Sequence, residues 1–303
     1  MAVANEMRQA VTWTSGQSPN LEDWSLVYRD VRYRVHKQST VNGLMFMIRR
    51  TIKVKPEIAA LGLPSQIQRY LMLGEPFKDG GLVLICGGNG QGKSTTAAAL
   101  LLARVSTHGY FGLTVEEPVE FPLQGTYQAK NGRLGYIIQV PAKSSSFASD
   151  LRDAMRCYPA NSRGSMLLVG EVRSGAAAAE LLRASVNGLL VITTIHAGDP
   201  IAALERILAL AQSEMGPAES RSLLSHSLRA VIAQKLDAKQ LYVDALFSPN
   251  ANSGVASLIR TDQIPQIGSL HNQQQVWLKR GTLVESLIEA QRQRNEDHSE
   301  THV

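Results

Sequence analysis

The stretch GLVLICGGNGQGKSTTAAALLLARV, residues 81–105, decides the fold. It begins with a continuous apolar run, residues 81–86, which is typical of a parallel strand buried on both faces. The run passes through a glycine-rich turn into an alanine- and leucine-rich stretch, residues 94–105, whose composition favours a helix. The turn satisfies the pattern GxxxxGK[ST] of a phosphate-binding P-loop through Gly87, Gly92, Lys93 and Ser94. The sequence therefore predicts a strand, a P-loop and a helix in succession.

The P-loop predicts a nucleotide site. Its glycines let successive backbone N–H groups converge on phosphate oxygens, and the positive end of the following helix also favours an anion. Lys93 would reach the β- and γ-phosphates, and the Ser94 hydroxyl would be a ligand of Mg²⁺. The competing interpretation, an accidental glycine turn, does not account for the strand and helix on either side. We therefore expect ATP and Mg²⁺ as cofactors, with the nucleotide bound by Gly87, Gly88, Asn89, Gly90, Gln91, Gly92, Lys93, Ser94 and Thr95.

Strands and helices alternate after the P-loop. Further apolar strands are predicted at residues 112–115, 165–169, 189–194 and 241–247. Helical patterns are predicted at residues 147–157, 176–185, 201–212, 218–234 and 283–294. This alternation predicts an α/β fold with a doubly wound, mostly parallel sheet.

The chain before the P-loop has a different character. Residues 1–20 are polar and aperiodic, and we expect them to be a loose end. Residues 31–37 alternate between apolar and basic side chains, and residues 43–52 are also strand-like. A helix is predicted at residues 64–73, followed by a loop at residues 74–81. We therefore expect a small N-terminal α+β domain at residues 1–75 and a larger domain at residues 76–303, with a polar tail from about residue 291.

The composition indicates an ordinary globular protein. Of 303 residues, 44% are hydrophobic, which is enough for a sizeable core. The net charge of +5 comes from 31 basic and 26 acidic residues that are scattered without a long run, so we do not expect nucleic acid as a partner. Cys86 and Cys157 have no metal-binding spacing, and free thiols in a reducing cytosol are the simplest interpretation. No signal peptide or apolar run of about 18 residues is visible, so we expect a cytoplasmic protein.

Acidic residues follow two of the predicted strands. Glu171 ends the segment LLVGE, and ligands of a doubly wound sheet bind at the carboxyl ends of its strands. Glu171 is therefore a candidate to polarise an attacking water or to support Mg²⁺ through a water, although a solvated loop acid remains an alternative. Glu116, Glu117 and Glu120 follow another strand, and such close carboxylates repel one another unless a cation neutralises them. They predict a metal–water network near the γ-phosphate, or otherwise a solvated face.

A histidine follows a third strand. His196 ends an apolar segment in ITTIHAGDP, residues 192–200, so it too should lie at the ligand edge of the sheet. A lone histidine is often structural, and its spacing alone favours neither a structural nor a catalytic role.

These four segments, in this order, resemble the secretion and type IV pilus traffic-ATPase family, over about residues 32–236. The alternating segment VRYRV and a closing helix SLRAVIAQKL are also similar. The resemblance implies a RecA-like P-loop domain behind a small, truncated, PAS-like domain, in a homohexamer. By matching position, it implies that Glu171 is the Walker B glutamate and that Glu116, Glu117, Glu120 and His196 fall on the family's acidic and histidine boxes. It also implies that Arg32 and Arg34 lie near the nucleotide.

The chain departs from the family pattern at two positions of these boxes. Glu117 stands where the family usually has aspartate, and Ser174 stands where an acid usually follows the segment GEVR. Both departures leave the rate of turnover open.

The resemblance implies an ATP-hydrolysing motor for type IV pilus dynamics or for type II or type IV secretion, including conjugative transfer. Such a motor would be peripheral at the inner membrane and would act on a membrane platform protein. A nucleotide-binding regulatory or assembly subunit with little turnover is one alternative. A RecA-like DNA motor is another, but no basic stripe with interleaved aromatic residues supports it.

Overall fold

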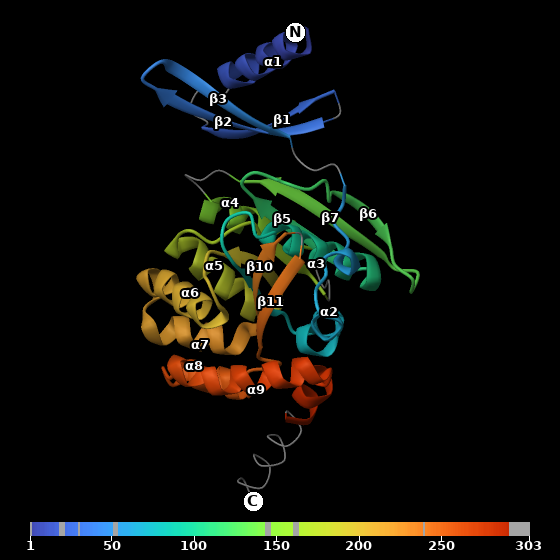
Figure 1. Ribbon diagram of the computed structural model, residues 1–303, viewed down its shortest axis with the longest axis vertical. Helices are drawn as coiled ribbons and strands as arrows, with labels where there is room; N and C mark the ends of the chain where they lie inside the picture. Colours follow the sequence, from blue (N-terminus) through green and yellow to red (C-terminus); the bar gives the residue numbers. More distant parts are fainter. Residues whose placement is uncertain are drawn as a thin grey trace, which may run out of the picture.

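The N-terminal part of the chain is built on a small antiparallel sheet. The computed structural model describes residues 2–17, 22–29, 31–50, 54–142, 147–159, 164–238 and 240–290. The first of these segments contain α1 (Ala2–Gln17), β1 (Asp23–Tyr28), β2 (Val31–Thr40) and β3 (Gly43–Arg50). The three strands pair in the order β1-β2-β3, and Figure 1 shows α1 lying against this sheet.

The larger part of the chain is built on a second sheet. Its strands are β4 (Gly81–Cys86), β5 (Phe111–Glu116), β6 (Gly125–Gln128), β7 (Leu134–Pro141), β8 (Met166–Val169), β9 (Leu190–Ile195), β10 (Leu228–Asp237) and β11 (Gln240–Phe247). They lie in the order β11-β10-β4-β9-β8-β5-β7-β6. All neighbours are parallel except the two edge pairs, β10 with β11 and β6 with β7. The predicted α/β fold with a mostly parallel sheet is confirmed.

Helices cover both faces of the large sheet. They are α2 (Ser65–Met72), α3 (Lys93–His108), α4 (Phe147–Ala154), α5 (Gly175–Val186), α6 (Pro200–Met215), α7 (Pro217–Ser227), α8 (Gly254–Arg260) and α9 (Ile267–Arg280), with short 3-10 turns η1 (Ile58–Ala60), η2 (Glu75–Phe77), η4 (Met155–Cys157) and η5 (Ile264–Gln266). Figure 1 shows α2 and α3 on one side of the sheet and α4 to α7 on the other.

The central strand β4 connects these two layers. All six of its residues are buried. Because side chains alternate along a strand, Leu84 packs into the core that includes α5 and α6, while Ile85 packs into the core that includes α2 and α3. This double burial is why β4 reads as an unbroken apolar run in the sequence.

The expectation of a loose N-terminus is wrong. Residues 2–17 form α1, and Val11 of that helix is buried against Leu26 of β1 and Val35 of β2. The indole N–H of Trp24 also donates a hydrogen bond to the Thr14 hydroxyl, at 3.1 Å. These contacts come from strands later in the chain, so the local polarity of the helix did not indicate them.

The predicted helix at residues 218–234 is only half right. α7 ends at Ser227, and the rest of the segment belongs to β10, including most of the stretch that resembled a closing helix. The first seven residues of β10 are buried between β4 and β11. A short apolar run buried on all sides has no periodicity that separates a helix from a strand.

α2, which we expected in the N-terminal domain, packs into the core of the large sheet. The Tyr70 hydroxyl donates to a backbone carbonyl of β10 at 3.0 Å. The buried guanidinium of Arg104 on α3 donates from Nη1 to the backbone carbonyls of Leu71 (2.6 Å) and Leu73 (2.9 Å) at the end of α2. It also lies 4.6 Å from the centre of the Phe77 ring. We therefore propose that the boundary between the two domains lies before η1.

The described part of the chain ends with a further helical segment at residues 283–290. The remainder of the predicted helix at residues 283–294, and the predicted polar tail from residue 291, lie outside the described residues. Among the helices that the structure describes, none has both the length and the apolar character that a membrane crossing requires.

Candidate functional site

Four parallel strands of the large sheet end side by side. β4, β9, β8 and β5 are neighbours in that order and run in the same direction. The P-loop follows β4, and His196 follows β9. Glu171 lies two residues after β8, and Glu116 is the last residue of β5. Because neighbouring strands are about 4.8 Å apart, the structure gathers these predicted residues along one edge of the sheet, where ligands of such folds bind.

The P-loop is shaped by its glycines. Gly90 and Gly92 have φ angles of 72° and 81°, which lie in the left-handed region that favours glycine. Gly92 is also the N-terminal cap of α3, so the positive end of that helix opens onto the loop. Ser94 and Thr95 follow in the first turn of α3 and are half-buried. The sequence pattern thus produces the strand, loop and helix that phosphate binding requires.

Lys93 closes the loop on itself. Its side chain is buried, and Nζ donates hydrogen bonds to the carbonyl oxygens of Gly87 (3.0 Å) and Gly88 (2.8 Å). Burial lowers the pKa of the Lys93 ammonium, while nearby negative charges oppose this shift, first that of Glu171 and more weakly that of Glu120. Both carboxylates are therefore within electrostatic reach of Lys93 at this edge.

Glu171 is held by a neighbouring arginine. Its Oε2 accepts hydrogen bonds from Arg173 Nη2 (2.6 Å) and Nε (2.7 Å). Arg173 is the last residue of the segment GEVR, and no pattern in that segment indicates its role. A small cavity of about 100 Å³ opens here, lined by Glu117, Phe147, Glu171, Arg173, Ser174 and Ala177. Its volume suits a few water molecules rather than a nucleotide.

Ser174, one of the two departures from the family pattern, has a structural role. Its hydroxyl accepts a hydrogen bond from the backbone N–H of Ala177 at 3.3 Å, which makes it the N-terminal cap of α5. Serine is among the residues that cap helices best. The serine that stands in place of the family's acid therefore provides a hydrogen-bond acceptor for a backbone N–H at the start of α5.

The three glutamates of the acidic box have three different environments. Glu116 is 5% exposed, and its Oε1 accepts a hydrogen bond from Gln139 Nε2 at 3.3 Å. Burial raises the pKa of Glu116 to about 7. Glu117 lines the small cavity beside Glu171, and Glu120 is half-buried and acts on Lys93 through its charge. The three glutamates are close together in the sequence, but they differ in burial and in the groups around them.

His196 and the two N-terminal arginines have different positions. His196 is exposed directly after β9. Arg32 and Arg34 lie on β2, on the same face of the small sheet, so they come from a different sheet from the other predicted residues. Directly opposite Arg34 on β3 is Arg49. The structure therefore places basic side chains together on this face.

Two glutamines support the site, and neither was predicted from the sequence. Gln139 on β7 bonds to Glu116, as described above, and Gln234 on β10 donates from Nε2 to the Gln91 carbonyl at 2.6 Å. No local signal identified either residue, because each acts through a strand that is distant in sequence.

Ser94 and Glu171 are the residues that fit a magnesium ion. Within the described segments, no three or more His, Cys, Asp or Glu side chains are grouped closely enough to hold a metal by themselves. Mg²⁺ in nucleotide sites takes most of its ligands from phosphates and water, with only one or two from the protein. A hydroxyl in the first turn of α3 and a carboxylate at the strand edge fit that donor set. The protein would hold the metal together with a nucleotide.

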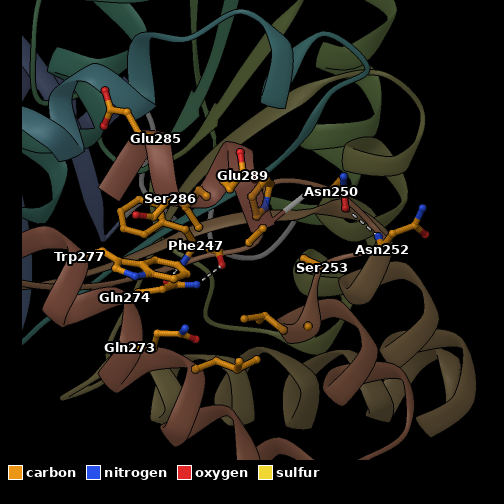
Figure 2. Close-up of a pocket in the computed structure, with 16 residues that line it drawn as sticks. Phe247, Asn250, Asn252, Ser253, Gln273, Gln274, Trp277, Glu285, Ser286 and Glu289 are labelled. Carbon is orange, nitrogen blue, oxygen red and sulfur yellow. Dashed lines mark hydrogen bonds between the residues drawn. The ribbon is translucent and has the colours of Figure 1, made fainter. Parts of the chain in front are cut away.

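A larger pocket lies elsewhere, between the end of β11, the helices α8 and α9, and residues 283–290 (Figure 2). It has a volume of about 560 Å³, and Trp277 and Gln274 of α9 lie along it. Its lining contains Glu285 and Glu289 but no lysine, arginine or histidine. Lacking any cation or P-loop residue, it is poorly suited to phosphate, and it is separate from the site described above.

The comparisons with known proteins agree with this geometry. The family model described as type II/IV secretion system protein matches residues 12–295. Type II secretion system protein E of Dickeya dadantii is 34% identical over 185 residues, covering 60% of this chain and 32% of that protein. The type IV pilus retractation ATPase PilT of Pseudomonas aeruginosa is 32% identical over 217 residues, covering 68% of this chain and 60% of that protein. The crystal structure of the pilus retraction motor PilT with bound ADP superimposes with a TM-score of 0.66 at 26% identity, covering 83% of this chain and 69% of the other.

The chain is shorter than these relatives. It spans about a third of the length of the Dickeya protein and 60% of the Pseudomonas protein.

Proposed function

The chain belongs to the type II/IV secretion system protein family, and from this premise we propose that it is an ATP-hydrolysing motor of a type IV pilus or of a type II or type IV secretion machine. The observation that supports hydrolysis most directly is that the P-loop after β4 and Glu171 after β8 lie at one edge of the sheet, with the charge of Glu171 acting on Lys93. A nucleotide-binding loop and a carboxylate at the same edge are the two parts that ATP hydrolysis requires.

In this proposal, each residue of the edge has a task. The N–H groups from Gly87 to Thr95 bind the phosphates, and Lys93 exchanges its bonds to the Gly87 and Gly88 carbonyls for bonds to phosphate oxygens. Glu171 accepts a proton from the attacking water, while Arg173 holds that carboxylate in place. Glu116, Glu117, Glu120 and His196 orient the surrounding waters. Mg²⁺, bound with the nucleotide by Ser94 and through water by Glu171, would neutralise phosphate charge.

The motor would work as a homohexamer on a membrane platform protein. The names of the relatives describe components of secretion and pilus machines, and a soluble motor of such a machine would be cytoplasmic and peripheral at the inner membrane. Arg32 and Arg34 would approach the nucleotide as subunits assemble. The basic residues are scattered along the sequence without a long run, which argues against a nucleic-acid partner.

The test is phosphate release by the purified chain and by its Lys93→Ala variant. We expect the variant to lose at least about 10²-fold in rate, because no other side chain in the loop supplies positive charge to the developing phosphate oxyanion. Lys78→Ala is a matched control, because that lysine is exposed and pairs with Glu75 on the surface.

The outcome separates the competing functions. A Lys93→Ala rate within twofold of wild type would show that hydrolysis occurs elsewhere. A wild-type chain that binds ATP and releases no phosphate as an assembled oligomer would instead be a regulatory subunit.

A further inference from the structure

The P-loop rests on a glutamine of the neighbouring strand β10. Gln234 is 5% exposed, and its Nε2 donates to the backbone carbonyl of Gln91 at 2.6 Å. In return, the side-chain carbonyl of Gln91 accepts a hydrogen bond from the backbone N–H of Leu236. Two hydrogen bonds of opposite direction therefore join the middle of the loop to β10.

The two ends of the loop also lie against Gln234. A Cβ atom built on Gly87 would be 2.4 Å from the backbone oxygen of Gln234, and one built on Gly92 would be 3.3 Å from its Nε2. The first distance is shorter than any side chain tolerates. Gly87, Gln91 and Gly92 thus all contact this one residue, which fixes the distance between the loop and β10.

The bond to Gln91 also sets the direction of an N–H group. The carbonyl of Gln91 and the N–H of Gly92 belong to one planar trans peptide unit, in which the two groups point in opposite directions. Because Gln234 holds the carbonyl toward β10, the N–H of Gly92 points away from β10. An N–H fixed in advance needs no reorganisation when it binds an anion.

A contribution to folding stability is a poor explanation for the side-chain amide of Gln234. The Oε1 atom of Gln234 is buried and has no hydrogen-bond partner among the described residues. A buried polar atom without a partner is destabilising, and such atoms are rare enough in native proteins to call for a reason. An apolar side chain of the same length would remove this cost along with the bond to Gln91.

We propose that Gln234 is a positioning residue for nucleotide binding, which orients the Gln91–Gly92 peptide of the P-loop toward the phosphates. This rests on the proposed function, because it assumes that the loop binds a nucleotide. Gln234 acts through the loop backbone and does not itself contact the nucleotide.

The test compares two buried glutamines. Gln234→Met is expected to weaken ADP binding about five- to tenfold, measured by titration calorimetry, which corresponds to the loss of one hydrogen bond of ordinary strength. Its melting temperature without nucleotide should stay within about 2 °C of wild type, because an unpartnered atom leaves together with the bond. Hydrogen exchange of a peptide covering residues 87–93 should become faster in the variant.

The matched control is Gln274→Met. Gln274 on α9 is also buried, and it both accepts from the backbone N–H of Phe247 (2.8 Å) and donates to its carbonyl (2.9 Å); the two bonds are drawn in Figure 2. This variant leaves two backbone groups without partners, so its melting temperature should fall by at least about 4 °C while ADP affinity is unchanged.

Two results would overturn the inference while leaving the proposed function intact. One is wild-type ADP affinity in Gln234→Met, and the other is a loss of affinity matched by an equal loss of stability. If the wild-type chain itself fails to bind ADP, both the inference and the proposed function are wrong.

Discussion

At the scale of single residues, environment rather than residue type separates the carboxylates of the site. Glu171 is partly exposed and forms an ion pair with Arg173. Glu116 is buried, and burial raises its pKa to about 7, so it is partly protonated near neutral pH. A charged carboxylate can accept a proton, whereas a protonated carboxyl group cannot, although it can both donate and accept a hydrogen bond. Two glutamates at neighbouring strand ends therefore have different chemical capacities.

We predict that Glu171→Gln retains ATP binding and loses turnover. Glutamine keeps the size of the side chain but cannot accept the proton of the attacking water, and such a loss typically lowers the rate by about 10²–10⁴. Phosphate release and ATP titration on the same preparation measure both properties. Normal turnover in this variant would assign the proton acceptor to the acidic box instead.

We predict that Glu116 makes the large domain less stable as pH rises. The folded-state pKa of about 7 exceeds the ordinary glutamate value of 4.5, so between these values the folded state binds more protons than the unfolded state. Stability should therefore fall from pH 4.5 to pH 7, by up to about 3 kcal/mol for this group, and stay constant above. Urea unfolding at pH 5 and pH 8 measures the change.

The Glu116→Gln variant provides the control for this effect. It should lose most of the difference between pH 5 and pH 8, whereas Glu117→Gln should keep it. An unchanged pH dependence in Glu116→Gln would assign the effect to other groups.

At the scale of elements, the sequence predicts four central strands and the edge strand β11 of the large sheet, but it predicts part of the buried strand β10 as a helix. β4, β5, β8 and β9 were all predicted, because central parallel strands are continuous apolar runs. The strands β6 and β7 were missed: β6 has only four residues, and β7 alternates clearly between exposed and buried positions over its first four residues alone. The helices α8 and α9 were also missed.

The candidate site was also predicted only in part from the sequence. Residues at the ends of predicted strands were placed at the correct edge, because parallel topology alone brings those ends together. Gln234 was missed because its strand was predicted as a helix, and its bond to the P-loop spans 143 residues of sequence. Local patterns contain no information about which distant strand becomes a neighbour. The catalytic roles of the site residues stay predictions.

We predict that Arg104→Met destabilises the large domain by about 2–4 kcal/mol. Its guanidinium donates to two carbonyls at the end of α2, and hydrogen bonds of charged groups contribute about 1.5–3 kcal/mol each. The variant leaves the carbonyls of Leu71 and Leu73 without this donor. Chemical unfolding measures the loss, and Arg206→Met on the exposed face of α6 is the control. Equal stability of both variants would contradict a linking role for Arg104 between α2 and α3.

At the scale of the whole molecule, the described chain has two parts whose cores are separate. The core of α1 and the small sheet is separate from the two cores of the large sheet. On the face of the small sheet away from α1, Arg34 lies directly opposite Arg49, so this face carries positive charge.

We predict that turnover depends on ring assembly and on these arginines. ATPase rate per subunit should rise with protein concentration, in parallel with the mass measured by sedimentation. The Arg32→Ala/Arg34→Ala double variant should still bind ATP but hydrolyse it at least about tenfold more slowly, because an arginine at the phosphates of comparable enzymes contributes about 10³–10⁵ in rate.

Arg29→Ala is the matched control for the double variant, since that exposed arginine pairs with Glu6 at the surface and lies just before β2. A monomer with full activity, or a double variant with the wild-type rate, would exclude a ring-dependent mechanism.

The position of β10 has a consequence during synthesis. β4 and the P-loop are the first parts of the large sheet to leave the ribosome, but the strand that supports the loop follows 143 residues later. At a translation rate of about 5–20 residues per second, the loop waits roughly 7–30 seconds for Gln234. A nascent chain that stops before residue 228 therefore lacks this support of its nucleotide site, and ATP should bind its loop more weakly than in the complete fold.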